Sequence, residues 1–236
     1  MNKLYILIAL TISFTVSAQI STSGTSNSGA TASAIGLETT ASGVASTAMG
    51  RETLASGHYS TAMGYLTTAG GETTASGVAT TAMGRETEAT ADYSTAIGFL
   101  TKAYGGSSVA MGRQTLANAL YSTAMGYLTT ASGESSSSMG YQTTASGDYS
   151  TALGYLTVAS GGSSSAMGRS TSATELYATA MGHETTASGN SSTATGYKTT
   201  ASGASSTAMG KETTAGGDNS IAMGYLTSAS GGSSIA

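Results

Sequence analysis

The residues that could carry out chemistry are few and lie far apart in the sequence. His58 and His183 are the only histidines, and neither has a companion at metal-ligand spacing, so both are expected to be exposed and solvated. The aspartates Asp92, Asp148 and Asp218 are too sparse for a calcium-binding roll, which needs Asp in nearly every turn. The abundant serines have no His/Asp constellation to activate them. The sequence therefore predicts no catalytic residue, no metal site, no cofactor and no enzymatic activity.

A stripe of tyrosines is the best candidate for a binding surface. Its members stand at positions that are otherwise mostly Ser: Tyr59, Tyr93, Tyr121, Tyr149 and Tyr177. From Tyr93 onward they recur at every second copy of a short repeat. Rigid amphipathic rings are favoured at protein-binding surfaces. The alternative, in which these rings simply cover an Ala-rich backbone, stays open.

This short repeat must position the tyrosines. Each S-T-A-M-G-like block ends in a Gly, and twelve of the thirteen intervals between these glycines have the same length, a step from i to i+14. The glycines are Gly36, Gly50, Gly64, Gly84, Gly98, Gly112, Gly126, Gly140, Gly154, Gly168, Gly182, Gly196, Gly210 and Gly224. A fixed short period is typical of a stacked repeat architecture. We expect these glycines to act as structural turns at positive φ.

Each unit holds two short segments. The third residue after the block Gly is Thr in every copy, from Thr39 to Thr227, and the fifth is Ala, from Ala41 to Ala229. Side chains alternate within the block as they do in strands, with Thr and Met at one parity and Ser and Ala at the other. We therefore predict a β-roll or β-solenoid of 14-residue coils, with residue i beside residue i+14 at about 4.8 Å.

The expected interior of one coil is a Met, a Thr and some Ala. This is too little apolar area to offset the entropy of ordering a whole coil, so packing against further copies of the chain is expected.

The residue after the block Gly tends to alternate between cationic and aromatic types. The series runs Arg51, Tyr65, Arg85, Phe99, Arg113, Tyr127, Tyr141, Tyr155, Arg169, His183, Tyr197, Lys211 and Tyr225. In a roll these side chains would stack with cations beside rings, and Glu52, Leu66, Glu86 and Leu100 would alternate in the next row. A solvated face that prevents edge pairing and a ligand-binding face both fit this pattern.

Composition excludes several partners and indicates export. Charged residues make up 8% of the chain and the net charge is -4, without the Lys/Arg clusters that nucleic acid or anionic lipid require. Residues 1–18 have the pattern of a secretory signal peptide, followed by a lead-in over 19–29. The apolar run in this segment is too short to span a membrane, so we expect no membrane insertion. The mature chain is expected outside the cell.

Two irregularities interrupt the repeat. The interval from Gly64 to Gly84 is longer than the others, as if eight residues of a two-coil segment were lost, and a distorted coil or loop is expected between Tyr65 and Met83. The sequence also stops at residues 233–236, just before the next Met-Gly is due. We expect a fragment whose downstream part holds an anchor or a trimerisation domain.

The blocks resemble a known family. The segment NSIAMG at 219–224, followed by Thr-x-Ala-x-Gly, is similar to the head repeats of YadA-type trimeric autotransporter adhesins, and the resemblance covers residues 30–236. It implies a left-handed parallel β-roll, assembled as a homotrimer and displayed outside the cell, on the outer membrane if an anchor follows. It also implies attachment to extracellular matrix proteins, cells or other surfaces. Thr39 and Thr47 stand where this family often has Val or Ala, and Met replaces Ile in most blocks.

Two other functions fit the pattern. A Thr in every coil, from Thr39 to Thr227, would form a hydroxyl row suited to ice or another lattice, provided that the row faces outward. A passive spacer that holds a downstream domain away from the cell is the second.

Overall fold

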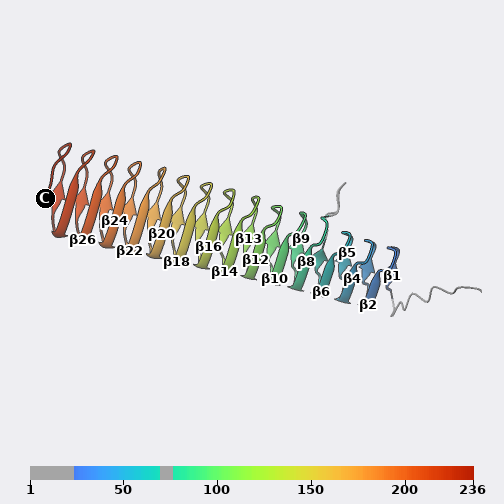
Figure 1. The fold of residues 1–236 in the computed structure, drawn as a ribbon. Coiled ribbons are helices and arrows are strands. Elements are labelled where there is room, and N and C mark those ends of the chain that lie inside the picture. The colour runs from blue at the N-terminus through green and yellow to red at the C-terminus, as the bar shows by residue number, and fades with distance from the viewer. Residues whose placement is uncertain (1–23, 70–76) are drawn as a thin grey trace, which may run out of the picture.

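The structure, a computed structural model, describes residues 24–69 and 77–236 of the chain. Every regular element in these ranges is a strand. The strands alternate between two sheets, and successive coils lie side by side along one axis (Figure 1). The signal peptide predicted over 1–18 lies outside the described residues, as does the lead-in up to residue 23.

Each coil contributes one five-residue strand and one two-residue strand. The long-strand sheet has 14 strands: β2 (Ser33–Leu37), β4 (Thr47–Arg51), β6 (Thr61–Tyr65), β8 (Thr81–Arg85), β10 (Thr95–Phe99), β12 (Val109–Arg113), β14 (Thr123–Tyr127), β16 (Ser137–Tyr141), β18 (Thr151–Tyr155), β20 (Ser165–Arg169), β22 (Thr179–His183), β24 (Thr193–Tyr197), β26 (Thr207–Lys211) and β28 (Ile221–Tyr225). The short-strand sheet has 15 strands: β1 (Ser26–Asn27), β3 (Thr40–Ala41), β5 (Leu54–Ala55), β7 (Thr68–Ala69), β9 (Glu88–Ala89), β11 (Lys102–Ala103), β13 (Leu116–Ala117), β15 (Thr130–Ala131), β17 (Thr144–Ala145), β19 (Val158–Ala159), β21 (Ser172–Ala173), β23 (Thr186–Ala187), β25 (Thr200–Ala201), β27 (Thr214–Ala215) and β29 (Ser228–Ala229).

All strand pairs in both sheets are parallel, and the register follows the sequence period. Ala110 pairs with Ala124, and Ala117 pairs with Ala131, so each residue lies beside its equivalent in the next repeat. The predicted parallel solenoid of 14-residue coils is therefore confirmed. Because equivalent residues stack at about 4.8 Å, any residue type that recurs at one position forms a continuous row along the roll.

The long interval between Gly64 and Gly84 is a single coil. Strand β6 pairs directly with β8, with Thr61 beside Thr81, and β7 pairs with β9, with Thr68 beside Glu88. The interval thus takes the place of one coil and is six residues longer than the others, which is also the length that two coils would have after losing eight residues. Residues 70–76 of the predicted irregular segment lie outside the described part of the chain. The strands on both sides keep the regular register.

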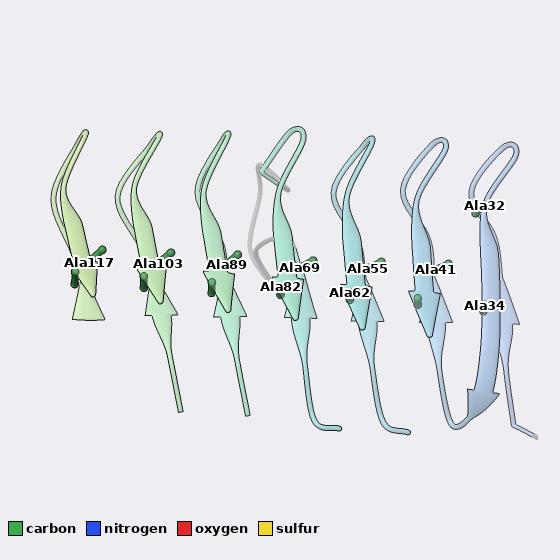
Figure 2. Packing of buried hydrophobic residues seen from close by; sticks show 14 of the residues in the cluster. Ala32, Ala34, Ala41, Ala55, Ala62, Ala69, Ala82, Ala89, Ala103 and Ala117 are labelled. Carbon is green, nitrogen blue, oxygen red and sulfur yellow. The ribbon is translucent and has the colours of Figure 1, made fainter. Parts of the chain in front are cut away.

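In the described part of the chain, the interior consists of small side chains. Two rows of Ala, one from each sheet, are at most 2% exposed and lie between the sheets (Figure 2). Rows of Thr and Ser complete the interior, for example Thr101 and Ser108. Because side chains alternate along a strand, the burial of Ala48 places Met49 on the outer face. The prediction of an interior Met was therefore wrong: sheets this close leave room for a methyl or hydroxyl group but not for a thioether chain.

The block glycines serve close approach within the strands. Gly126 is the fourth residue of β14 and has φ of 127°, so positive φ was correctly predicted. A Cβ atom added there would lie 2.0 Å from the carbonyl oxygen of Gly140 in the next coil. The turn itself falls two residues later, at Leu128, where φ is 53°. The predicted turn glycines Gly50, Gly64, Gly84, Gly98, Gly112, Gly126, Gly140, Gly154 and Gly168 therefore lie inside strands instead of at turns.

Two non-glycine residues per coil adopt left-handed φ. One follows the long strand, as Leu128 does, and the other precedes it, as Tyr121 does. Their backbone N–H groups donate to carbonyl oxygens of the preceding coil, Leu128 to Arg113 at 3.0 Å and Tyr121 to Gly106 at 2.9 Å. Hydrogen bonds between coils thus hold both edges of the roll in place.

Candidate binding surfaces

The five predicted tyrosines share one edge of the roll. We call Tyr59, Tyr93, Tyr121, Tyr149 and Tyr177 the tyrosine row; these residues are 58–63% exposed. All five occupy the left-handed turn that precedes a long strand. The four from Tyr93 to Tyr177 stand on alternate coils, and their backbones are therefore about 10 Å apart.

Tyr59 belongs to the same alternation, which its sequence spacing hides. The step from Tyr59 to Tyr93 is longer than the later steps of the row, but because of the long coil only Ala79 occupies the equivalent turn between them. Strand β6 pairs with β8 and β8 pairs with β10, so Tyr59 lies two coils before Tyr93. The row thus extends over nine coils with one tyrosine on every second coil.

The backbone of the tyrosine row is in a costly conformation. The φ angles of these five residues are 57–59°. For a bulky residue this region is unfavourable by about 1–2 kcal/mol. Between the tyrosines the same turn position carries small residues: Ala79, Ser107, Ser135 and Ser163.

Where the residue before a tyrosine is polar, its side chain holds the turn. Asp148 Oδ1 accepts the backbone N–H of Glu134 at 2.9 Å, and Asp92 Oδ1 accepts that of Val78 at 2.8 Å. His58 Nδ1 does the same for Val44 at 3.0 Å.

These bonds change how the predicted polar residues are interpreted. His58 is exposed but also bonded to the preceding coil, and Asp218 accepts the N–H of Ala204 at 2.8 Å. His183 Nε2 lies 3.3 Å from Glu184, and its ring is tilted against that of Tyr197 at 5.2 Å. Within the described residues no three His, Cys, Asp or Glu side chains gather as metal ligands would.

At the opposite edge, cations and rings stack as predicted. The Arg85 guanidinium lies 5.7 Å from the ring centre of Tyr65 and 5.2 Å from that of Phe99. Arg113 continues the stack, at 5.7 Å from Phe99 and 5.3 Å from Tyr127. Where three tyrosines follow each other, the rings of Tyr127, Tyr141 and Tyr155 stack at 5.0 Å. We call this series the cation–aromatic row.

Neighbouring acids neutralise many of these cations. Arg51 pairs with Glu52 at 2.9 Å, and Arg85 pairs with Glu86 at 3.0 Å. Such exposed pairs contribute at most about 1 kcal/mol each. Since these cations are engaged by rings and carboxylates of the same chain, the geometry favours a structural role for this edge.

The outer face of the long-strand sheet carries a row of large apolar residues. The third residue of each long strand is Met, Ile or Leu, with Thr195 in β24 as the exception. Met49, Met111, Met209 and Met223 are 36–52% exposed. We call this the methionine row. It is an apolar strip along the roll with no partner in the single chain.

One polar cluster on the short-strand sheet escaped the sequence analysis. The Tyr104 hydroxyl donates to the Glu88 carboxylate, and Lys102 Nζ lies 3.4 Å from Glu88. The hydrogen bond with Tyr104 raises the pKa of Lys102, and burial together with the bond to Glu88 raises the pKa of Tyr104. Tyr104 stands where other coils carry Ser132 or Ser146, so only the fold indicates what it contacts.

The threonine row proposed for ice binding faces inward. Each described member from Thr39 to Thr213 is at most 1% exposed. A hydroxyl row inside the roll cannot contact a crystal surface, so the condition for that alternative is not met.

The fold and its surface rows define a class: a parallel β-solenoid with an interior of small residues and rows of repeated side chains along its edges. No helix in the described part of the chain is long and apolar enough to cross a membrane. The profile of the YadA head domain repeat (two copies) matches residues 28–53, 55–74, 75–101, 103–129, 131–157, 159–185, 173–199, 187–213 and 215–236. The chain therefore belongs to the YadA head repeat family. A comparison with curated proteins found no match.

Proposed function

We propose that this roll is a non-enzymatic adhesive head, displayed outside the cell, that attaches to surfaces through many weak contacts. The tyrosine row is the observation that carries the proposal, because it repeats one exposed aromatic group on every second coil. Membership of the YadA head repeat family supports it. Extracellular matrix proteins, cell surfaces and other surfaces are the partners that this function implies.

Repetition of the tyrosine along the roll would make the attachment strong. A single exposed ring offers a weak contact, but linked contacts raise the effective concentration of each other and can increase avidity by about 10²–10⁴. A rigid roll keeps the rings in a fixed geometry, so little ordering entropy is lost on attachment.

Assembly as a homotrimer would multiply the row and cover the methionine row. The methionine row gives the single chain an apolar strip along one flat sheet, which favours packing against copies of itself. The tyrosine row lies on an edge of the roll, so packing of the long-strand sheets leaves it accessible.

Assembly is tested by light scattering on the mature chain, which begins after the predicted signal peptide. We expect a trimer, and we expect Met125→Glu with Met139→Glu to lower the molar mass to that of a monomer. Thr130→Glu with Thr144→Glu places the same charges on the short-strand sheet and should leave the trimer intact. A wild-type monomer, or equal effects of both pairs, would contradict assembly through the methionine row.

Adhesion is tested with beads that carry the chain, on matrix-protein, polysaccharide and bare surfaces. We expect attachment that increases steeply with the density of the chain on the bead. Beads that attach to none of these surfaces better than uncoated beads would contradict the adhesive function and leave a passive spacer.

A further inference from the structure

We propose that the tyrosine row binds an extended β-1,4-linked glucan chain, as found in cellulose, running along the axis of the roll. This inference rests on the proposed adhesive function and names the chemical class of its ligand. Three features of the row support it: its period, its alternation with serine and a turn that serine fills as well as tyrosine does.

The period of the row is close to that of the glucan. One coil extends the roll by about 4.8 Å, and one glucose extends such a chain by slightly more, so the two periods stay in step over a few units. Successive glucose units are turned over relative to each other, so the same ring face recurs on every second sugar. The tyrosines recur on every second coil, which would allow each ring to pack against an equivalent C–H face.

The coils between the tyrosines carry groups that can bond to the sugars between the stacked ones. At the same turn position they carry Ser107, Ser135 and Ser163, whose hydroxyl groups can donate to and accept from sugar hydroxyls. From Tyr59 to Tyr177 only Ala79 breaks the alternation of tyrosine with serine. Both partners thus repeat with a period of two units.

The turn does not need tyrosine in order to fold. Tyr93, Tyr121 and Tyr149 have φ of 57–58°, a region that is unfavourable for any residue with a Cβ atom. The serines at equivalent turns adopt the same conformation, with φ of 54° at Ser107 and Ser135. The fold therefore accepts a small residue at this position.

A proline-rich polypeptide is the strongest competing ligand. One turn of a polyproline II helix rises about 9.3 Å, which also approximates two coils. Recognition of that helix depends on aromatic-lined grooves, however. Here a single row of rings stands on an edge, and Ser107 and Ser135 separate its neighbours.

The residues beside the rings favour glucan over an N-acetylated glycan. The residue before each tyrosine changes along the row, from Asp92 to Leu120 to Asp148 to Leu176. An acetamido methyl would need an apolar site beside every ring, whereas the carboxylates of Asp92 and Asp148 are committed to backbone N–H groups.

Two variants of the full chain test the proposal. The first replaces all five tyrosines of the row by Ser, the residue that the intervening coils already carry. The second keeps the composition and changes only the spacing: Tyr121→Ser with Ser135→Tyr, and Tyr177→Ser with Ser163→Tyr. The matched control replaces Tyr141, Tyr155 and Tyr225 by Ser at the opposite edge. Circular dichroism establishes that each variant keeps its strand content.

The probes are microcrystalline cellulose, chitin, amylose and a proline-rich peptide, with binding measured by depletion of the chain from solution. We expect adsorption to cellulose but not to amylose, and a loss of about tenfold or more in affinity for both row variants. The control variant should bind as the wild type does.

Several results would overturn the proposal. These are adsorption to cellulose no greater than to amylose, full binding by the variant with altered spacing, or binding to chitin or the proline-rich peptide in place of cellulose. Bead attachment to other surfaces in the same variants separates this failure from failure of the adhesive function, because an adhesin with another ligand would still attach.

Discussion

The hydroxyl oxygens of Ser138 and Thr143 lie 2.7 Å apart inside the roll. Ser138 occupies a position that neighbouring coils fill with Ala, as at Ala124 and Ala152. The equivalent threonine hydroxyls of adjacent coils, such as those of Thr129 and Thr157, are buried without a hydrogen-bond partner. Ser138 thus gives Thr143 a hydrogen bond that the equivalent threonines of the adjacent coils lack.

This difference predicts opposite effects for two identical substitutions. Thr129→Val removes an unpaired hydroxyl at nearly constant shape and should be neutral or stabilising by up to about 1 kcal/mol. Thr143→Val leaves the Ser138 hydroxyl buried alone and should destabilise by about 1–3 kcal/mol. Urea unfolding followed by circular dichroism measures both.

The double variant Thr143→Val with Ser138→Ala provides the control. It removes both hydroxyls and should recover most of the stability lost in Thr143→Val. Equal effects of valine at positions 129 and 143 would mean that the bond contributes nothing.

Close packing of the block glycines against the next coil predicts a severe effect of a single methyl group. In Gly126→Ala the new Cβ would lie 2.0 Å from the Gly140 carbonyl oxygen, and φ of 127° is unfavourable for alanine. We expect a loss of more than about 4 kcal/mol, or failure to fold. Gly106→Ala is the matched control, since its nearest neighbour is Leu120 Cδ2 at 3.8 Å. A thermal melt that is equally shifted for both variants would contradict this explanation.

The repeat predicted the fold more completely than it predicted the direction of side chains. Glycine spacing and alternation were sufficient for the coil length, the two strands and the parallel register, because a short period leaves few other ways to stack. The sequence showed that Ala48 and Met49 point to opposite faces of the strand, but Met was wrongly placed on the inner face. Hydrophobicity favoured Met inside, whereas the volume available between closely spaced sheets admits only Ala, Ser and Thr.

Features that depend on neighbouring coils were less accessible to sequence reasoning. The cation–aromatic row was predicted because its residues alternate at a fixed spacing. Tyr59 was not placed in phase with Tyr93, since the enlarged coil hides that the two are only two coils apart. The cluster of Glu88, Lys102 and Tyr104 also arises from stacking, because Lys102 lies directly beside Glu88 in the neighbouring coil.

The cation–aromatic row predicts graded effects of removing an arginine. Arg113 lies between two rings, at 5.7 Å from Phe99 and 5.3 Å from Tyr127, whereas Arg169 contacts one ring, that of Tyr155, at 5.6 Å. At about 0.5–1 kcal/mol for each exposed contact, Arg113→Ala should cost about twice as much stability as Arg169→Ala. The shift in urea midpoint measures the two losses. Lysine at position 113 should retain part of the effect, and equal losses for the two alanine variants would argue against ring contacts as the cause.

The cluster around Tyr104 predicts a loss of stability in alkaline solution. The pKa values of Lys102 and Tyr104 are both raised in the folded chain, the first chiefly by the hydrogen bond with Tyr104 and the second chiefly by burial. A group whose pKa is raised on folding holds its proton more tightly in the folded state. Its contribution to stability is therefore complete at lower pH and disappears as the pH rises above the ordinary tyrosine value of 10.0.

Tyr104→Phe isolates this contribution, because it removes the hydroxyl that bonds to Glu88 and leaves the ring beside Lys102. We expect the variant to be less stable than the wild type near neutral pH and the difference to shrink above about pH 10, as the wild type loses its proton. Urea midpoints across this range give the difference directly. Tyr225→Phe, an exposed tyrosine in the last long strand, controls for the general loss of a phenol. A difference between Tyr104→Phe and wild type that stays constant with pH would show that the bond donated to Glu88 is not the source of the difference in stability.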